Sequence, residues 1–87
     1  MKPMERRRER RTRESGIVEI AISSPTPLTI QADLVETSAS GFRASHGCQA
    51  LEPGLAVGFT RNGLSGRARV MWTHVLNGRR TSGFLVL

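Results

Sequence analysis

The sequence predicts an all-β protein, a small six-stranded antiparallel β-barrel that follows a flexible basic N-terminal segment. Three observations carry this prediction. Apolar and polar residues alternate with period two after Gly16, as they do in half-buried strands. Turn-forming pairs, Asn62-Gly63 and Asn77-Gly78 among them, separate the alternating stretches. No stretch after residue 16 has a helical period, and six short strands avoid exposed edges by closing into a barrel.

Each expected strand comes from its own alternation. Val18, Ile20 and Ile22 share one face of a strand at 17–23, and prolines at 25 and 27 prevent that strand from running into the next. The other strands are expected at 28–36, 41–45, 55–61, 65–74 and 80–87. The two Asn-Gly pairs predict type I′ hairpin turns, because both central positions of such a turn need positive φ.

Aromatic residues are few, with one tryptophan, three phenylalanines and no tyrosine. Trp72 has the same parity as Ala68 and Val70 in its strand, so it is expected in the core rather than on a surface where bases stack. Arg67 and Arg69 have the opposite parity and are expected to point outward, as ordinary surface charge rather than as an extension of a phosphate-binding face.

The chain divides into a flexible arginine-rich segment at 1–15 and a barrel domain at 16–87. Its 87 residues include 13 basic and 7 acidic side chains, so the formal net charge is +6. Residues 1–14 contain seven basic and three acidic residues, which is 7 − 3 = +4. All but one of the basic residues are arginine, whose planar guanidinium binds phosphates and guanine edges with two parallel hydrogen bonds.

Several classes of protein are not expected. A single cysteine, Cys48, allows no internal disulfide. The sequence contains no apolar run of about 18 residues, so no membrane insertion is expected. No secretory signal is expected either, and the sequence therefore predicts a cytoplasmic protein. His46 and Cys48 lie two residues apart and His74 is distant, which is too little for a zinc site or a catalytic pair. We therefore expect no enzyme, no metal and no cofactor.

Two motifs, together with the order of the hairpins, carry a family resemblance. The spacing R-x-x-x-R occurs twice near the N-terminus, as Arg6/Arg10 and Arg7/Arg11. The stretch from Glu36 to Gly41 reads E-x-S-x-x-G, and the chain later contains Gly66-Arg67-Ala68-Arg69-Val70-Met71-Trp72 and Ser82-Gly83-Phe84. Together they resemble the PilZ domain, a six-stranded barrel that binds the bacterial second messenger cyclic di-GMP. The family signature has Asp or Asn where this chain has Glu36.

The resemblance implies a ligand, a site and a role. Cyclic di-GMP is the implied ligand. Its guanines and phosphates would be contacted by Arg6, Arg7, Arg10 and Arg11. Glu36, Ser38 and Gly41 would form the opposite wall of the site. The chain would then be a signalling receptor or adaptor, a monomer or weak dimer, that orders its tail over the ligand and alters an unidentified protein effector.

Two alternatives stay open. A PilZ-like module that has lost its ligand could act through protein contacts alone, and the Glu36 departure favours this interpretation. A small basic barrel could instead bind nucleic acid, as its charge would allow. Nucleic acid is not the expected partner, because the aromatic residues that would stack on bases are predicted to be buried.

Overall fold

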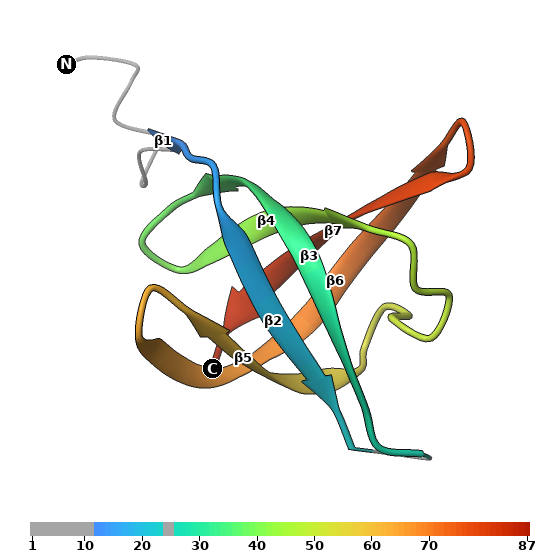
Figure 1. The fold of residues 1–87 in the computed structure, drawn as a ribbon, viewed down its shortest axis with the longest axis horizontal. Helices are drawn as coiled ribbons and strands as arrows, with labels where there is room; N and C mark the ends of the chain where they lie inside the picture. The colour runs from blue at the N-terminus through green and yellow to red at the C-terminus, as the bar shows by residue number, and fades with distance from the viewer. Residues whose placement is uncertain (1–11, 24–25) are drawn as a thin grey trace, which may run out of the picture.

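The computed structural model describes residues 12–23 and 26–87, and every regular element in these ranges is a β-strand (Figure 1). The strands are β1 (Thr12–Arg13), β2 (Ile17–Ile22), β3 (Leu28–Thr37), β4 (Gly41–His46), β5 (Ala56–Arg61), β6 (Leu64–Leu76) and β7 (Arg79–Val86). All six expected strands are present, and their ends lie within two residues of the expected ones. The short strand β1 was not expected.

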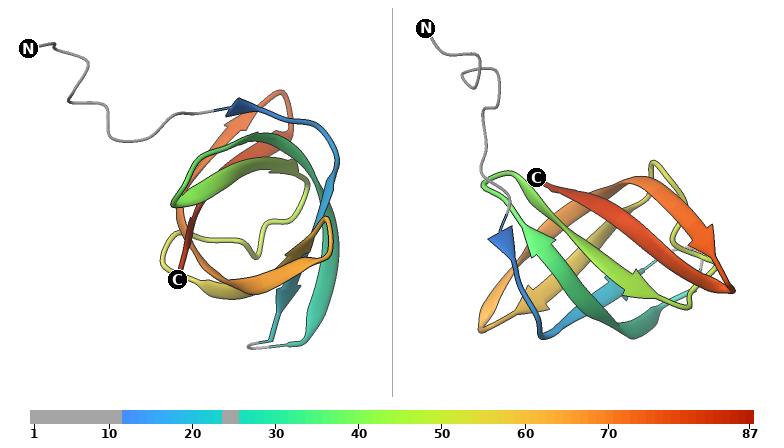
Figure 2. Two further views of the ribbon diagram at one scale, coloured as in Figure 1. Left: turned by 90° about the vertical axis from the view of Figure 1, so that its left-hand side faces the viewer. Right: turned by 90° about the horizontal axis from the view of Figure 1, so that it is seen from above.

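Six of the strands close into a barrel. They are hydrogen-bonded in the order β3-β2-β5-β6-β7-β4, and β4 pairs back onto β3 (Figure 2). Every pairing is antiparallel. The predicted closed antiparallel barrel is therefore confirmed.

Strand β1 lengthens the sheet at one end of β3. Residues of β2 pair with β3 only as far as Asp33, which leaves that edge of β3 open beyond this point. Thr12 lies opposite Thr37 and Arg13 lies opposite Glu36, so β1 continues along the open edge. The described sheet thus begins at Thr12, inside the segment expected to be flexible.

The core follows the predicted alternation. The buried apolar side chains on the strands come from the inward faces of β2 to β7, and they are Val18, Ile20, Ile22, Ala32, Leu34, Phe42, Ala44, Val57, Phe59, Ala68, Val70 and Phe84. One further core residue, Leu51, comes from the loop between β4 and β5 and is 1% exposed. Both Asn-Gly pairs have positive φ at both residues, as the type I′ prediction requires.

The predicted core position of Trp72 is wrong. Val70 lies opposite Phe84, but Trp72 lies opposite Gly83, so the register between β6 and β7 shifts at Met71. This β-bulge adds one residue to β6 and reverses the parity of the residues that follow it. Trp72 therefore lies half-buried on the outer face of the barrel, while Thr73 turns toward the interior.

Candidate functional site

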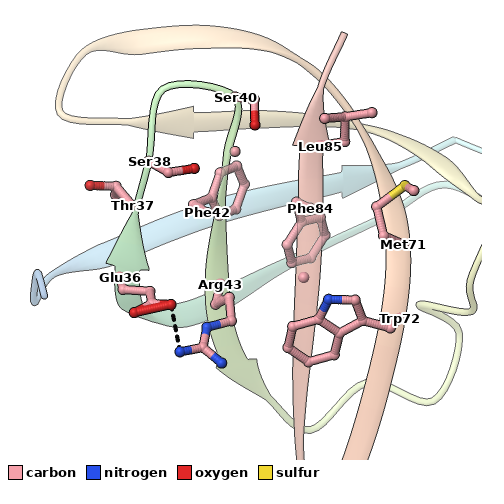
Figure 3. Close-up of a pocket in the computed structure, with 12 residues that line it drawn as sticks. Glu36, Thr37, Ser38, Ser40, Phe42, Arg43, Met71, Trp72, Phe84 and Leu85 are labelled. Carbon is pink, nitrogen blue, oxygen red and sulfur yellow. Dashed lines mark ion pairs between the residues drawn. The ribbon is translucent and has the colours of Figure 1, made fainter. Parts of the chain in front are cut away.

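A hollow of about 140 Å³ lies on the outer face where β3, β4, β7 and β6 lie side by side (Figure 3). We call it the outer hollow. Its lining comes from the end of β3, the turn that follows, and the facing parts of β4, β6 and β7: Glu36, Thr37, Ser38, Ser40, Gly41, Phe42, Arg43, Met71, Trp72, Gly83, Phe84 and Leu85. Ligand pockets of drug size usually enclose about 300–1,000 Å³, so the outer hollow has room for one part of a larger ligand.

A straight row of residues crosses these four strands at the base of the outer hollow. Glu36 lies opposite Arg43, Arg43 lies opposite Gly83, and Gly83 lies opposite Trp72. The guanidinium of Arg43 forms an ion pair with Glu36, with 2.5 Å between Nη2 and Oε2 (Figure 3). Its Cζ also lies 5.9 Å from the centre of the Trp72 ring, within the range of a cation–π contact. A carboxylate, a guanidinium and an aromatic ring therefore lie together at the base of the outer hollow.

Gly83 allows the tryptophan to take this position. A Cβ atom at residue 83 would lie 2.3–2.6 Å from atoms of the Trp72 indole, closer than side chains tolerate. The indole therefore lies directly over the backbone of β7. Sequence reasoning missed both Trp72 and Arg43, because their positions depend on register shifts at Met71 in β6 and between Leu34 and Glu36 in β3.

The turn between β3 and β4, residues 38–41, forms the upper rim of the outer hollow. The backbone N–H of Ser38 donates to the carbonyl of Gly41 at 2.9 Å and closes the turn. The N–H of Val86 donates to the carbonyl of Ser40 at 2.7 Å and holds the turn against the end of β7. A Cβ atom on Gly41 would lie 2.0 Å from the carbonyl oxygen of Phe84. Close packing of β4 on β7 by itself requires glycine at position 41.

The structure brings together three of the expected site residues, because Glu36, Ser38 and Gly41 all line the outer hollow. The other four, Arg6, Arg7, Arg10 and Arg11, lie outside the described residues. The chain nevertheless joins them to the site, because Arg11 directly precedes Thr12, and Thr12 lies opposite Thr37 on the rim of the outer hollow.

A second polar cluster lies inside the barrel, away from the outer hollow. His46 is 1% exposed and Ser82 is 0% exposed. The N–H of Cys48 donates to Nδ1 of His46 at 3.0 Å, and Nε2 of His46 lies 2.7 Å from Oγ of Ser82. Oγ of Ser82 lies 2.7 Å from Oγ1 of Thr73, which donates to the carbonyl of Leu51 at 3.2 Å.

A donor at one end, the N–H of Cys48, and an acceptor at the other, the carbonyl of Leu51, set the direction of every bond in this cluster. A backbone carbonyl only accepts, so the single hydroxyl proton of Thr73 goes to Leu51 and Ser82 donates to Thr73. Ser82 then accepts from Nε2–H of His46, which is neutral with Nδ1 unprotonated. Burial lowers the pKa of His46 below 6.5, and the charges of Arg80 and Arg79 lower it further. The cluster anchors the 47–55 loop and is closed to substrates.

Other features and the comparisons with known proteins give no further assignment. Within the described ranges no group of three or more His, Cys, Asp or Glu residues is placed to hold a metal ion. No helix in the same residues is long and apolar enough to cross a membrane. The chain matches no protein-family model and no curated protein sequence.

Proposed function

We propose that this protein is a PilZ-like receptor for cyclic di-GMP that acts in the cytoplasm. The observation that carries the proposal is the pairing of Thr12 with Thr37. It places Thr12, the residue that follows Arg11 in the sequence, opposite Thr37 and next to the rim that holds Ser38 and Gly41. This placement supports a site that uses both the R-x-x-x-R and the E-x-S-x-x-G motifs. The outer hollow, with its aromatic face, opens beside that junction.

The chemistry of the ligand matches these groups. Each guanine offers O6 and N7 to an arginine fork, and each phosphate accepts two parallel N–H bonds. Arg6, Arg7, Arg10 and Arg11 supply such forks. The outer hollow holds one planar ring against Trp72, and the rest of the dinucleotide lies outside it under the arginines. Ordering of the arginine segment over the ligand then changes the surface offered to a protein effector.

One observation favours the alternative of a PilZ-like interaction module without a ligand. Glu36, at the position where the family has Asp or Asn, is engaged by Arg43 in an ion pair. A carboxylate bound to an internal arginine must be released before it accepts from a guanine N–H. The cost of that release lowers the affinity for the dinucleotide.

Fluorescence titration with cyclic di-GMP tests the proposal directly. Trp72 is the single tryptophan and the chain has no tyrosine, so intrinsic emission reports on the outer hollow alone. We expect micromolar binding with a change in emission, confirmed by calorimetry. Joint replacement of Arg7 and Arg11 by alanine is expected to lower the affinity about 100-fold or more, because each removes a charge-assisted contact.

The matched control for the arginine variants is Arg67→Ala, which removes one exposed arginine of β6 and should change the affinity less than about threefold. Ser38→Ala is expected to weaken binding less than the double arginine variant. Absence of binding at high ligand concentration would contradict the proposal and favour the interaction module. Salt-dependent binding to DNA or RNA that the dinucleotide does not affect would favour the nucleic-acid alternative.

A substitution at position 36 tests whether Glu36 limits the affinity. In Glu36→Asp the carboxylate is one methylene shorter, which restores the family residue and draws the charge away from Arg43. We expect tighter cyclic di-GMP binding than in the wild type, measured by the same titration. An equal or weaker affinity in Glu36→Asp would show that the ion pair with Arg43 does not compete with the ligand.

A further inference from the structure

Arg61 occupies an unusual place at the end of the barrel next to the 38–41 turn. It is the last residue of β5 and precedes the Asn62-Gly63 turn. Phe59 points into the core and Thr60 points outward, so strand alternation directs Arg61 inward. Because Arg61 is the last residue of its strand, its side chain extends into the open end of the barrel, which we call the mouth.

The side chain of Arg61 reaches across this mouth. Two strands separate β5 from β4 in either direction around the barrel, so the two strands lie on opposite sides. The Cζ of Arg61 is nevertheless 5.8 Å from the centre of the Phe42 ring. Phe42 directly follows the 38–41 turn, lines the outer hollow and stacks on Phe84 at 4.8 Å. The guanidinium of Arg61, which comes from the opposite side of the barrel, therefore lies beside Phe42, the residue that follows the 38–41 turn.

Arg61 differs from two other arginines of the barrel, Arg43 and Arg79, in the partners of its guanidinium. Arg43 is paired with Glu36, and Arg79 is paired with Asp33. In the described part of the chain Arg61 has no ion pair. Its Nε, like that of Arg43, is buried without a hydrogen-bond partner, so the missing ion pair is what sets Arg61 apart. A buried donor that lacks a partner is costly, and its retention points to a role with a bound group.

We infer that Arg61 is a further ligand-binding residue, which donates to a phosphate oxygen of the bound dinucleotide. This inference rests on the proposed function. A ligand seated in the outer hollow and held by the 38–41 turn would place its phosphates near the mouth, because Phe42 both lines the outer hollow and contacts Arg61. Arg61 then supplies a cation that is held in place by Phe42, so less side-chain freedom is lost on binding than for an arginine without such a contact.

The test compares Arg61→Gln with Arg67→Gln, an equal loss of charge on the same β5–β6 hairpin at an exposed position. Titration with cyclic di-GMP is carried out at least about 20 °C below each melting temperature, so that unfolding does not contribute. We expect about tenfold or greater loss of affinity in Arg61→Gln and less than about threefold loss in Arg67→Gln. Arg61→Lys should lie between the wild type and Arg61→Gln, because the charge remains and the fork is lost.

The salt dependence of the affinity separates a phosphate contact from a purely structural role. Arg61→Gln should reduce the slope of log affinity against log salt concentration, whereas loss of packing on Phe42 alone would leave the slope unchanged. Equal affinities and slopes for the two glutamine variants would overturn the inference and leave the proposed function intact. If the wild type does not bind cyclic di-GMP, the proposed function and the role of Arg61 fall together.

Discussion

Gly41→Ala is expected to destabilise the barrel by at least about 2 kcal/mol even in the absence of ligand. The new methyl group would lie 2.0 Å from the carbonyl oxygen of Phe84, so β4 and β7 must separate at the point where they pair. Overpacking of this kind typically costs about 1–3 kcal/mol and occasionally more. A domain of this size has roughly 4–13 kcal/mol of stability, and each kcal/mol shifts the melting temperature by about 4–8 °C. Thermal and urea unfolding measure the loss.

Gly47→Ala is the matched control for this substitution. Gly47 is exposed, has an ordinary backbone conformation, and a Cβ there would meet nothing within 4 Å. Its replacement should be neutral or stabilising by up to about 1 kcal/mol, because alanine has less freedom in the unfolded chain. Equal melting temperatures for the two variants would show that β4 and β7 can separate without cost. Loss of ligand binding in Gly41→Ala is not evidence of a ligand contact, because the substitution also disturbs the turn.

The barrel is expected to lose stability as the pH falls below about 6.5, even before its carboxylates titrate. Burial, and then the charges of Arg80 and Arg79, lower the pKa of His46 in the folded state. Below 6.5 the unfolded chain therefore binds a proton that the folded chain does not. The free energy of unfolding falls with decreasing pH, by at most about 1.4 kcal/mol per pH unit, until the pH reaches the folded pKa. Protonation also places an N–H at Nδ1 against the N–H of Cys48.

Urea unfolding between pH 7.5 and 5 measures this slope. In His46→Gln the titrating group is gone, so the slope over this range should largely disappear, although the variant is less stable at every pH. His74→Gln removes the other histidine, which is exposed, and should retain the wild-type slope. A slope that survives in His46→Gln, or vanishes in His74→Gln, would show that His46 is not the responsible group. The wild-type profile alone is a further test, because a flat profile contradicts the assignment.

The fold was predictable because its signals are local. Period-two alternation placed Val18, Ile20 and Phe59 in the core, and the Asn-Gly pairs identified two hairpins whose dihedral angles have the expected sign. Leu51 was not predicted, because nothing in its surroundings has strand periodicity. It is buried because the loop after β4 crosses one end of the barrel, and that path depends on the cluster around His46.

The candidate site was predictable only in part, because its geometry depends on residues far apart in the sequence. The motif pointed to Glu36, Ser38 and Gly41, which all line the outer hollow. It gave no sign that the outer hollow contains Trp72, because neither Val70 nor Met71 is a residue type that marks a bulge. The close contact that requires glycine at 41 comes from a strand more than 40 residues later, and only the assembled barrel shows it.

The attachment of the 38–41 turn to β7 has a consequence for how the protein matures on the ribosome. Synthesis proceeds from the N-terminus, so the arginines and the turn emerge from the exit tunnel well before β7. Yet the turn is tied to Val86 and packed on Phe84, and the aromatic face of the outer hollow rests on Gly83. A nascent chain that lacks β7 therefore has Glu36, Ser38 and Gly41 but lacks the β7 wall of the outer hollow. The outer hollow is complete only when β7 docks, so a chain truncated before β7 is expected to lack it.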